Sequence, residues 1–429
     1  MPTPSILDAL YPLFIILKFI GSLWWLWGFF LLLFIFEGLW LFNKQAKYKN
    51  YEWVLLEIKV PREVQKPPKA MEQVLMNLHS LRNAASDLLE KYKDGEVTLW
   101  WSLELASYGG EIHFYIRAPR KHKSMTEASL YAQYPNVEIV EVPDYVDKLP
   151  NTTAEFYKIG QQIFGSEVIL SKDDVYPIRT YEEFKTPPEE GEALDPISSL
   201  IETLGKIDRK ENFFLQILIR PADDTWTKKA APIIKKFRTG SKIEETSVNA
   251  KGETITFARQ VPLTPGETDT LKAIERNVSK PGFETLIRFL YTAPKEIFNT
   301  NFARRGLKGA LNQYAAQNLN SFRFNYKTET RTCWIHFPHF FSQKRGEARR
   351  QRLLENFRKR KLPEELFTGK VLTSHPLNFN FASHSYVLNV EELATIYHLP
   401  SKAIITAPHI KLEESKKMGP PAGLAIYED

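Results

Sequence analysis

An apolar stretch near the N-terminus constrains this chain more than any other feature. About eighteen uncharged residues run from Phe19 to Phe36, between Lys18 and Glu37. At ~1.5 Å per residue such a helix spans roughly the ~30 Å hydrocarbon core of a bilayer. The aromatic side chains expected to anchor it in the membrane are Phe19, Trp24, Trp25, Trp27 and Phe36, with Trp40 just beyond. The pattern predicts a single-pass membrane anchor.

Two alternatives fit less well. A secretory signal peptide has a basic start, a shorter apolar core and a small-residue cleavage site, and these are not seen here. A buried core helix would need cover on every face. Because Lys44, Lys47 and Lys49 follow the span, the positive-inside rule places the C-terminal domains in the cytoplasm, on the inner membrane. A single cysteine, Cys333, agrees with a chain that needs no disulfide.

The remaining chain has the composition of a globular protein. Of 429 residues, 25% are charged and the net charge is +6, which allows two or three domains and says little about partners. The predicted class is α+β: one transmembrane helix, two similar ferredoxin-like units and a basic helical segment.

The first unit is predicted from the order of its elements. A strand at 51–60, a helix at 70–83, a hairpin at 100–117, a helix at 126–133 and a strand at 137–142 follow one another. That order is typical of a ferredoxin-like βαββαβ unit.

The second unit is predicted as a repeat of the first. Its first strand is expected at 213–219, followed by a helix at 226–237, and the motif Ala118-Pro119 recurs as Ala293-Pro294. A chance match around a common strand-to-helix proline is the alternative. The predicted boundaries are 1–50 for the anchor, 51–185 and 197–335 for the two α+β domains, 186–196 for an acidic proline-rich linker, 239–266 for a polar insertion, 336–386 for the basic segment and 387–429 for a C-terminal helix and extended tail.

The basic segment is the best candidate for a binding site. Arg-rich clusters bind phosphates through charge-assisted hydrogen bonds. Its cationic residues are Lys344, Arg345, Arg349, Arg350, Arg352, Arg358, Lys359, Arg360 and Lys361. Three readings stay open: a solvated helix face, a surface that lies on anionic lipid, and a nucleic-acid site.

Catalytic and metal motifs are weak. Cys333, His336 and His339 have a C-x-x-H-x-x-H spacing, but no fourth ligand is near in sequence, so no metal is expected. Ser102, His113 and Asp144 make a triad only on paper, because no G-x-S-x-G elbow is present. We expect no enzymatic activity and no cofactor.

Several segments resemble a known group of proteins. They are EWVLLEIKVPREVQKPPKAMEQVLMNLH, SLELASYGGEIHFYIRAPRK, YAQYPNVEIVEVPDYV, DDVYPIRTYEEF and LNVEELATIYHLPS, spread from residue 52 to residue 401. Together they resemble the membrane-anchored N-terminal region of bacterial type IV secretion and conjugation DNA-binding proteins, the FtsK/HerA/TraG-like group. In that group a RecA-like motor follows the Pro-Pro-Ala-Gly-Leu stretch, whereas this sequence stops at Asp429 and contains no G-x-x-x-x-G-K-[ST] motif.

The resemblance implies a non-enzymatic component of a secretion or DNA-transport machine. The expected partners are membrane lipid, a motor ATPase supplied in trans, DNA and further copies of the chain as a homo-oligomer. The alternative is a membrane-tethered module that binds nucleic acid or anionic lipid through residues 344–361.

Overall fold

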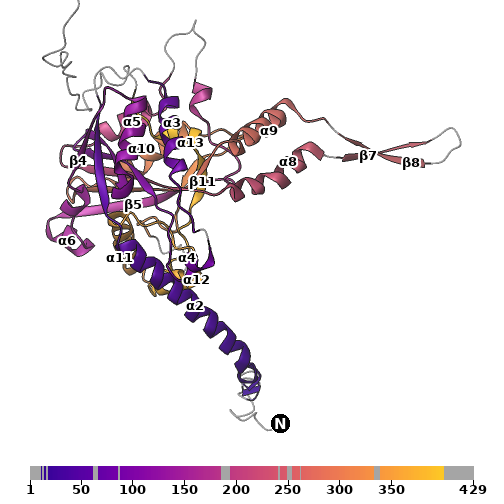
Figure 1. The fold of residues 1–429 in the computed structure, drawn as a ribbon, viewed down its shortest axis with the longest axis horizontal. Helices are drawn as coiled ribbons and strands as arrows, with labels where there is room; N and C mark the ends of the chain where they lie inside the picture. Colours follow the sequence, from indigo (N-terminus) through magenta and orange to yellow (C-terminus); the bar gives the residue numbers. More distant parts are fainter. Residues whose placement is uncertain are drawn as a thin grey trace, which may run out of the picture. The chain divides into compact units, whose positions relative to one another are not determined.

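A computed structural model describes most of the chain (Figure 1). The described residues are 11, 14, 15, 18–60, 66–85, 87–184, 194–239, 242–248, 254–260, 262–332 and 339–400. They fall into two compact units. The first combines Met1–Tyr51, Ala84–Val97 and Glu364–Ser374, and the second combines Glu52–Asn83, Thr98–Pro363 and His375–Asp429.

The described part of the first unit includes helices from distant parts of the sequence. They are α2 (Trp24–Lys49), α4 (Leu88–Tyr92) and α12 (Phe367–Leu372). The predicted span therefore continues as helix beyond Glu37, through the lysines at its end.

The second unit is built on one nine-stranded sheet in which all neighbouring strands are antiparallel. The strand order is β10-β5-β9-β6-β2-β3-β1-β4, and β11 pairs with β9. The strands are β1 (Trp53–Lys59), β2 (Trp101–Tyr108), β3 (Glu111–Pro119), β4 (Glu138–Val142), β5 (Gln161–Leu170), β6 (Asn212–Pro221), β9 (Gly282–Pro294), β10 (Phe322–Phe324) and β11 (Tyr386–Asn389).

The predicted first half is found in its predicted order, β1, α3, β2, β3, α5, β4. The turn between β2 and β3 is made by Gly109 and Gly110, whose φ values are 57° and 93°. A side chain at Gly109 would also lie 2.6 Å from the Arg209 carbonyl oxygen, so only glycine fits this turn.

The second half has the same strand order as the first, but it begins earlier than predicted. Its four strands are β5, β6, β9 and β10, and in both halves the sheet order is fourth, first, third, second. Ala118-Pro119 and Ala293-Pro294 end the third strand of their halves, as the aligned motif predicted. The strand at 213–219, however, belongs to β6 and is the second strand rather than the first.

The predicted domain boundary accordingly differs from the structure. β5 falls within the segment 51–185 assigned to the first domain, yet it pairs with β9 and β10 of the second half. The proline-rich segment 186–196 follows β5 inside the second half. The two halves meet where β2 pairs with β6, so the sheet is continuous across them. Pairing between strands that are distant in sequence sets this boundary, and the composition of the proline-rich segment does not indicate it.

Each face of the sheet is covered by its own set of helices (Figure 1). Residues alternate between faces along each strand, as Leu56 and Phe213 pack on one side and Leu55 and Phe214 on the other. The first face packs on α3 (Pro68–Ser80), α5 (Lys123–Gln133), α7 (Ser198–Gly205), α10 (Thr300–Asn312) and α13 (Val390–Ile396). The second face packs on α6 (Thr153–Lys158), α11 (Ser342–Arg358) and the 3-10 turn η2 (Tyr145–Lys148).

The predicted insertion 239–266 forms a separate hairpin. β7 (Lys242–Val248) and β8 (Thr254–Gln260) pair only with each other among the described strands. The hairpin follows α8 (Ala230–Thr239) and precedes α9 (Pro265–Val278), which starts at a capping box of Thr264 and Glu267. Further 3-10 turns are η1 (Arg120–His122), η3 (Tyr181–Phe184) and η5 (Asp224–Lys229).

The predicted C-terminal helix is confirmed, and it begins with a capping box. Asn389 accepts a hydrogen bond from the Glu392 backbone N–H at 2.8 Å, and Glu392 accepts one from the Asn389 N–H at 2.9 Å. Its position was not predicted: every residue of α13 is buried, and β11 before it joins the sheet. The segment 386–400 is therefore part of the core, and the predicted extended tail lies outside the described residues.

Candidate functional site

The basic segment contains helix α11, as predicted, but the helix covers only part of the segment 336–386. The helix stops at Arg358, and Arg360 adopts a left-handed backbone conformation with φ 45°. Phe341, immediately before the helix, is also left-handed, with φ 51°. Such conformations are rare for non-glycine residues and persist where surrounding contacts impose them.

Two of the nine predicted phosphate-binding residues are buried. Arg345 is 1% exposed, and its Nε donates to the Phe340 carbonyl at 3.0 Å. Arg360 is also 1% exposed. Both side chains are held inside the protein, so the prediction that they contact phosphate at the surface needs correction.

Arg360 is held by two carboxylates. Its guanidinium donates to Glu104 at 2.9 and 3.1 Å and to Asp144 at 2.5 and 2.9 Å. Glu104 is fully buried and also accepts from the hydroxyls of Tyr145, at 2.6 Å, and Ser102, at 2.5 Å. The structure thus satisfies a buried arginine with the paired geometry that guanidinium prefers.

The pKa shifts agree with this pairing. Burial opposes the charged form of Arg360, but the negative charge of Glu104 raises its pKa well above the ordinary value. Burial would raise the pKa of Asp144, yet Arg360 lowers it below its usual range. The cluster is therefore an ion pair at neutral pH.

A row of polar side chains crosses the sheet beneath the end of α11. Glu104 on β2, Gln216 on β6, Arg288 on β9 and Glu167 on β5 are successive cross-strand partners. Because directly paired residues share a face of the sheet, all four belong to one row. We call this set the polar row.

The polar row binds the C-terminal end of α11. Gln216 Nε2 donates to the Phe357 carbonyl at 3.2 Å. Arg288 donates to the carbonyls of Asn356 at 3.0 Å and Lys361 at 3.2 Å, and to Glu167 at 3.0 Å. Carbonyl groups at the C-terminal end of a helix have no hydrogen-bond partner within the helix, and a cation near them interacts favourably with the helix dipole. The row therefore fixes where α11 ends on the sheet.

The other basic side chains divide between internal contacts and the surface. Arg349 donates to the carbonyls of Tyr326 and Glu329, at 3.1 and 3.2 Å. Arg358 donates to the carbonyls of Val146 and Leu149, at 2.7 and 2.5 Å. Arg350 pairs with Glu347 at 3.0 Å. Lys344 and Lys359 are exposed, whereas Arg352 and Lys361 are half-buried. The segment is therefore mostly a set of structural contacts, a role that its charge pattern did not predict.

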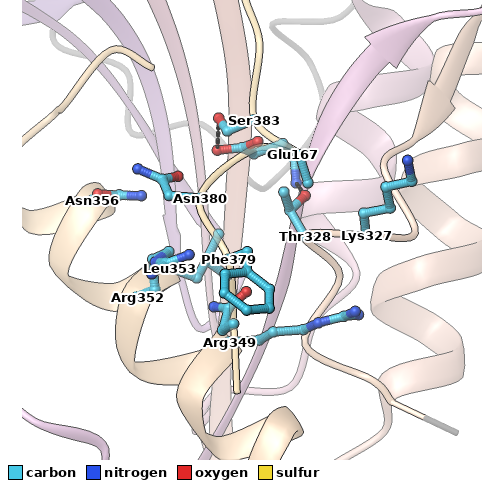
Figure 2. A pocket seen from close by; sticks show the side chains of 12 residues that line it. Glu167, Lys327, Thr328, Arg349, Arg352, Leu353, Asn356, Phe379, Asn380 and Ser383 are labelled. Carbon is cyan, nitrogen blue, oxygen red and sulfur yellow. Dashed lines mark hydrogen bonds between the residues drawn. The ribbon is translucent and has the colours of Figure 1, made fainter. Parts of the chain in front are cut away.

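A small cavity lies beside α11, as Figure 2 shows. Its cationic lining comes from Lys327, Arg349 and Arg352, while Ser383 Oγ donates to the buried Glu167 at 2.9 Å. Its volume is ≈ 20 Å³, enough for about one water molecule. Burial lowers the pKa of Arg349 and of Arg352. In this conformation the cavity is too small for a nucleotide or a base.

Ser102, His113 and Asp144 do not form a catalytic triad. Ser102 donates to Glu104, Asp144 binds Arg360, and His113 Nδ1 lies 2.6 Å from Glu57. Within the described ranges, no group of three His, Cys, Asp or Glu residues is placed to hold a metal ion. Cys333 and His336 lie outside those ranges, so the structure does not test their motif.

The side chains of the predicted anchor residues are at least half exposed. Their exposed fractions are 66% for Phe19, 75% for Trp24, 59% for Trp25, 55% for Trp27 and 50% for Phe36. α2 is 26 residues long and is the one helix in the described part of the chain that is long and apolar enough to cross a membrane. At ~1.5 Å per residue it extends about 39 Å.

The polar row was missed at the sequence level, although a signal for it exists. Three of its four members stand alone among apolar neighbours in their strands, as in LEL for Glu104, LQI for Gln216 and IRF for Arg288. A lone polar residue inside an apolar strand indicates a buried group that needs a partner.

Comparison with known proteins gives a family but no activity. No curated protein matches this sequence. One family model matches residues 43–411, which cover most of the chain from the end of α2 to beyond α13. This chain belongs to the family of that model, which is described as a domain of unknown function, DUF8128.

Proposed function

We propose that this chain is a non-enzymatic, membrane-tethered platform in a type IV secretion-like or DNA-transport machine. The observation that carries the proposal is the exposed apolar helix α2. Its side chains from Trp24 to Phe36 have little contact with protein, and the lysines that follow favour a cytoplasmic location for the rest of the chain. Water is a poor solvent for such a surface and lipid is a good one.

The platform itself would be the nine-stranded sheet. We infer that each half is a ferredoxin-like unit, because both halves have the strand order fourth, first, third, second with antiparallel neighbours. The β2–β6 pairing would then join two such units into one surface. A scaffold of this kind needs stable internal contacts more than a reactive site, and the polar row and the Arg360 cluster supply them.

The assignment to a transport machine rests on the resemblance to the FtsK/HerA/TraG-like group. The motor of this proposal is a separate ATPase, and the 429 residues themselves contain no P-loop motif. Further copies of the chain and DNA are the other partners of this proposal.

The alternative, a nucleic-acid or anionic-lipid module, now depends on fewer charges. Arg345 and Arg360 are buried, and Arg349 and Arg358 bind backbone carbonyls. What remains at the surface is centred on Lys344 and Lys359. Such a small set would give weak, strongly salt-dependent binding.

The test is isolation of the full chain from native membranes in mild detergent, after brief crosslinking, followed by mass spectrometry. We expect a P-loop ATPase as a separate polypeptide in an amount near that of the bait. An untagged strain and an unrelated tagged single-pass protein are the matched controls. Recovery of the chain alone, or with nucleic acid only, would refute the platform.

A further inference from the structure

Two short helices surround the end of the apolar span within the first unit. Tyr92 of α4 packs on Phe36 and Trp40 of α2, with ring centroids 5.3 and 4.8 Å apart. Asn43 Nδ2 donates to the Tyr92 carbonyl at 3.2 Å. Gly95, with φ 64°, lies so close to α2 that a Cβ would be 2.5 Å from the Asn43 carbonyl carbon. α4 is therefore held at the level where the span ends.

α12 lies at the same level of α2, although it is more than 300 residues away in sequence. The Thr368 backbone N–H donates to Glu37 Oε2 at 3.4 Å, and Lys44 lies 3.9 Å from Glu365. Glu37 is the first charged residue after the apolar stretch. The contacts of α4 and α12 thus cover residues 36–44 of α2, where a membrane-spanning helix would leave the hydrocarbon core.

Both short helices expose large apolar side chains. Leu88 and Leu89 of α4 are 72% and 67% exposed, and Phe367 and Leu372 of α12 are 62% and 60% exposed. Small helices in water gain nothing from such side chains. A continuous apolar surface is instead expected where protein meets another apolar phase.

The polar groups nearby are typical of a membrane interface. Lys44 and Lys91 lie 4.6 and 5.7 Å from the centre of the Trp40 ring. Aromatic rings and long lysine side chains concentrate at the headgroup level, where an apolar stem can be buried while the charge stays in water. In residues 84–97 and 364–374, acidic side chains outnumber basic ones. Attraction to anionic lipid would therefore contribute little, and apolar insertion would dominate.

We propose that α4 and α12 form an interfacial collar whose leucine and phenylalanine side chains enter the headgroup region of the cytoplasmic leaflet. The collar fixes the depth of α2 in the bilayer. The occupant of this surface is lipid, because both helices contact α2 at residues 36–44, where the span ends. This inference rests on the proposed membrane anchor.

The experiment places nitroxide labels at single cysteines in the full chain, reconstituted in nanodiscs. Cys333→Ser provides the background, and Leu89→Cys and Leu372→Cys report on the collar. Leu32→Cys, 67% exposed on α2, is the span control, and Ile159→Cys, 60% exposed in the second unit, is the aqueous control. Collision with oxygen, which prefers lipid, is compared with collision with a water-soluble nickel chelate.

We expect both collar labels at a depth between the two controls, near the phosphates, and the same depth in zwitterionic nanodiscs and in nanodiscs with anionic lipid. If Leu32 is in lipid but the collar labels behave like Ile159, the collar is refuted while the anchor stands. Collar labels shielded from both reagents would mean that protein covers the surface, and this also refutes the collar. If Leu32 itself collides mainly with nickel, the anchor and the collar both fail.

Discussion

Replacing Arg360 with methionine tests whether the buried ion cluster stabilises the second unit. Arg360→Met keeps the length of the side chain but removes four hydrogen bonds to Glu104 and Asp144, and leaves one buried and one half-buried carboxylate without their cation. Removing one partner of a buried pair costs about 3–5 kcal/mol. A unit of roughly 300 described residues unfolds with an entropy of about 0.6 kcal/mol/K, so the melting temperature should fall by about 5–8 °C.

The assay is thermal unfolding of the full chain in detergent, followed by tryptophan fluorescence. Trp100 is a local probe, because its Nε1 donates to the Arg360 carbonyl at 3.1 Å. Lys359→Met is the matched control: the residue is adjacent and exposed, and its loss should cost less than about 0.5 kcal/mol. The double variant Arg360→Met/Glu104→Gln should be more stable than the sum of the single variants predicts, because the second change removes an unpaired charge. Equal melting temperatures for Arg360→Met and Lys359→Met would refute the reasoning.

Three further predictions use the same preparations. The double variant Leu32→Arg/Phe34→Arg places two charges in the apolar span and should be released from membranes by alkaline carbonate, whereas Leu88→Arg/Leu89→Arg should be retained. Retention of Leu32→Arg/Phe34→Arg would contradict a span through α2. Arg349→Ala should lower the melting temperature by a few degrees, because two backbone carbonyls lose their hydrogen-bond donor, whereas Arg350→Ala removes only a half-exposed ion pair and should not. On the same protein, a gel-shift titration tests the nucleic-acid alternative. Steep salt dependence, and loss of DNA binding in Lys344→Ala/Lys359→Ala, would favour that alternative. Burial raises the pKa of Glu392 to about 8, so the folded state binds the proton of this carboxyl group more tightly than the unfolded state does. The free energy of unfolding should therefore fall as pH rises from about 5 to 8. In Glu392→Gln this fall should be absent.

Local signals predicted the first half of the sheet well. The helix at 70–83, the hairpin at 100–117 and the strand at 137–142 are each indicated by residues within a few positions of one another. The class α+β and the helical basic segment followed from the same kind of signal. These features need no knowledge of distant partners.

The errors all involve partners that are distant in sequence. β5 was missed as the start of the second half because Gly165 and Glu167 interrupt its apolar pattern. In the structure a Cβ at Gly165 would clash with the Phe289 carbonyl oxygen of β9 and lie 2.5 Å from a methyl group of Leu353 on α11, so glycine is required here. Glu167 forms a buried ion pair with Arg288. Both residues weaken the strand pattern for reasons that only α11 and β9 reveal.

The same contacts explain why a basic run can be a poor guide to a binding surface. Arg360 binds two carboxylates more than 200 residues away in sequence, one on β2 and one just after β4, while Arg288 binds the end of α11 from the second half. α11 and the residues just after it are thus held from both sides of the β2–β6 pairing. A helix in that position opposes separation of the two halves, and the charges that looked available for phosphate serve this purpose. The second unit should accordingly unfold as one body, with α11 as the connection between the two halves of its sheet.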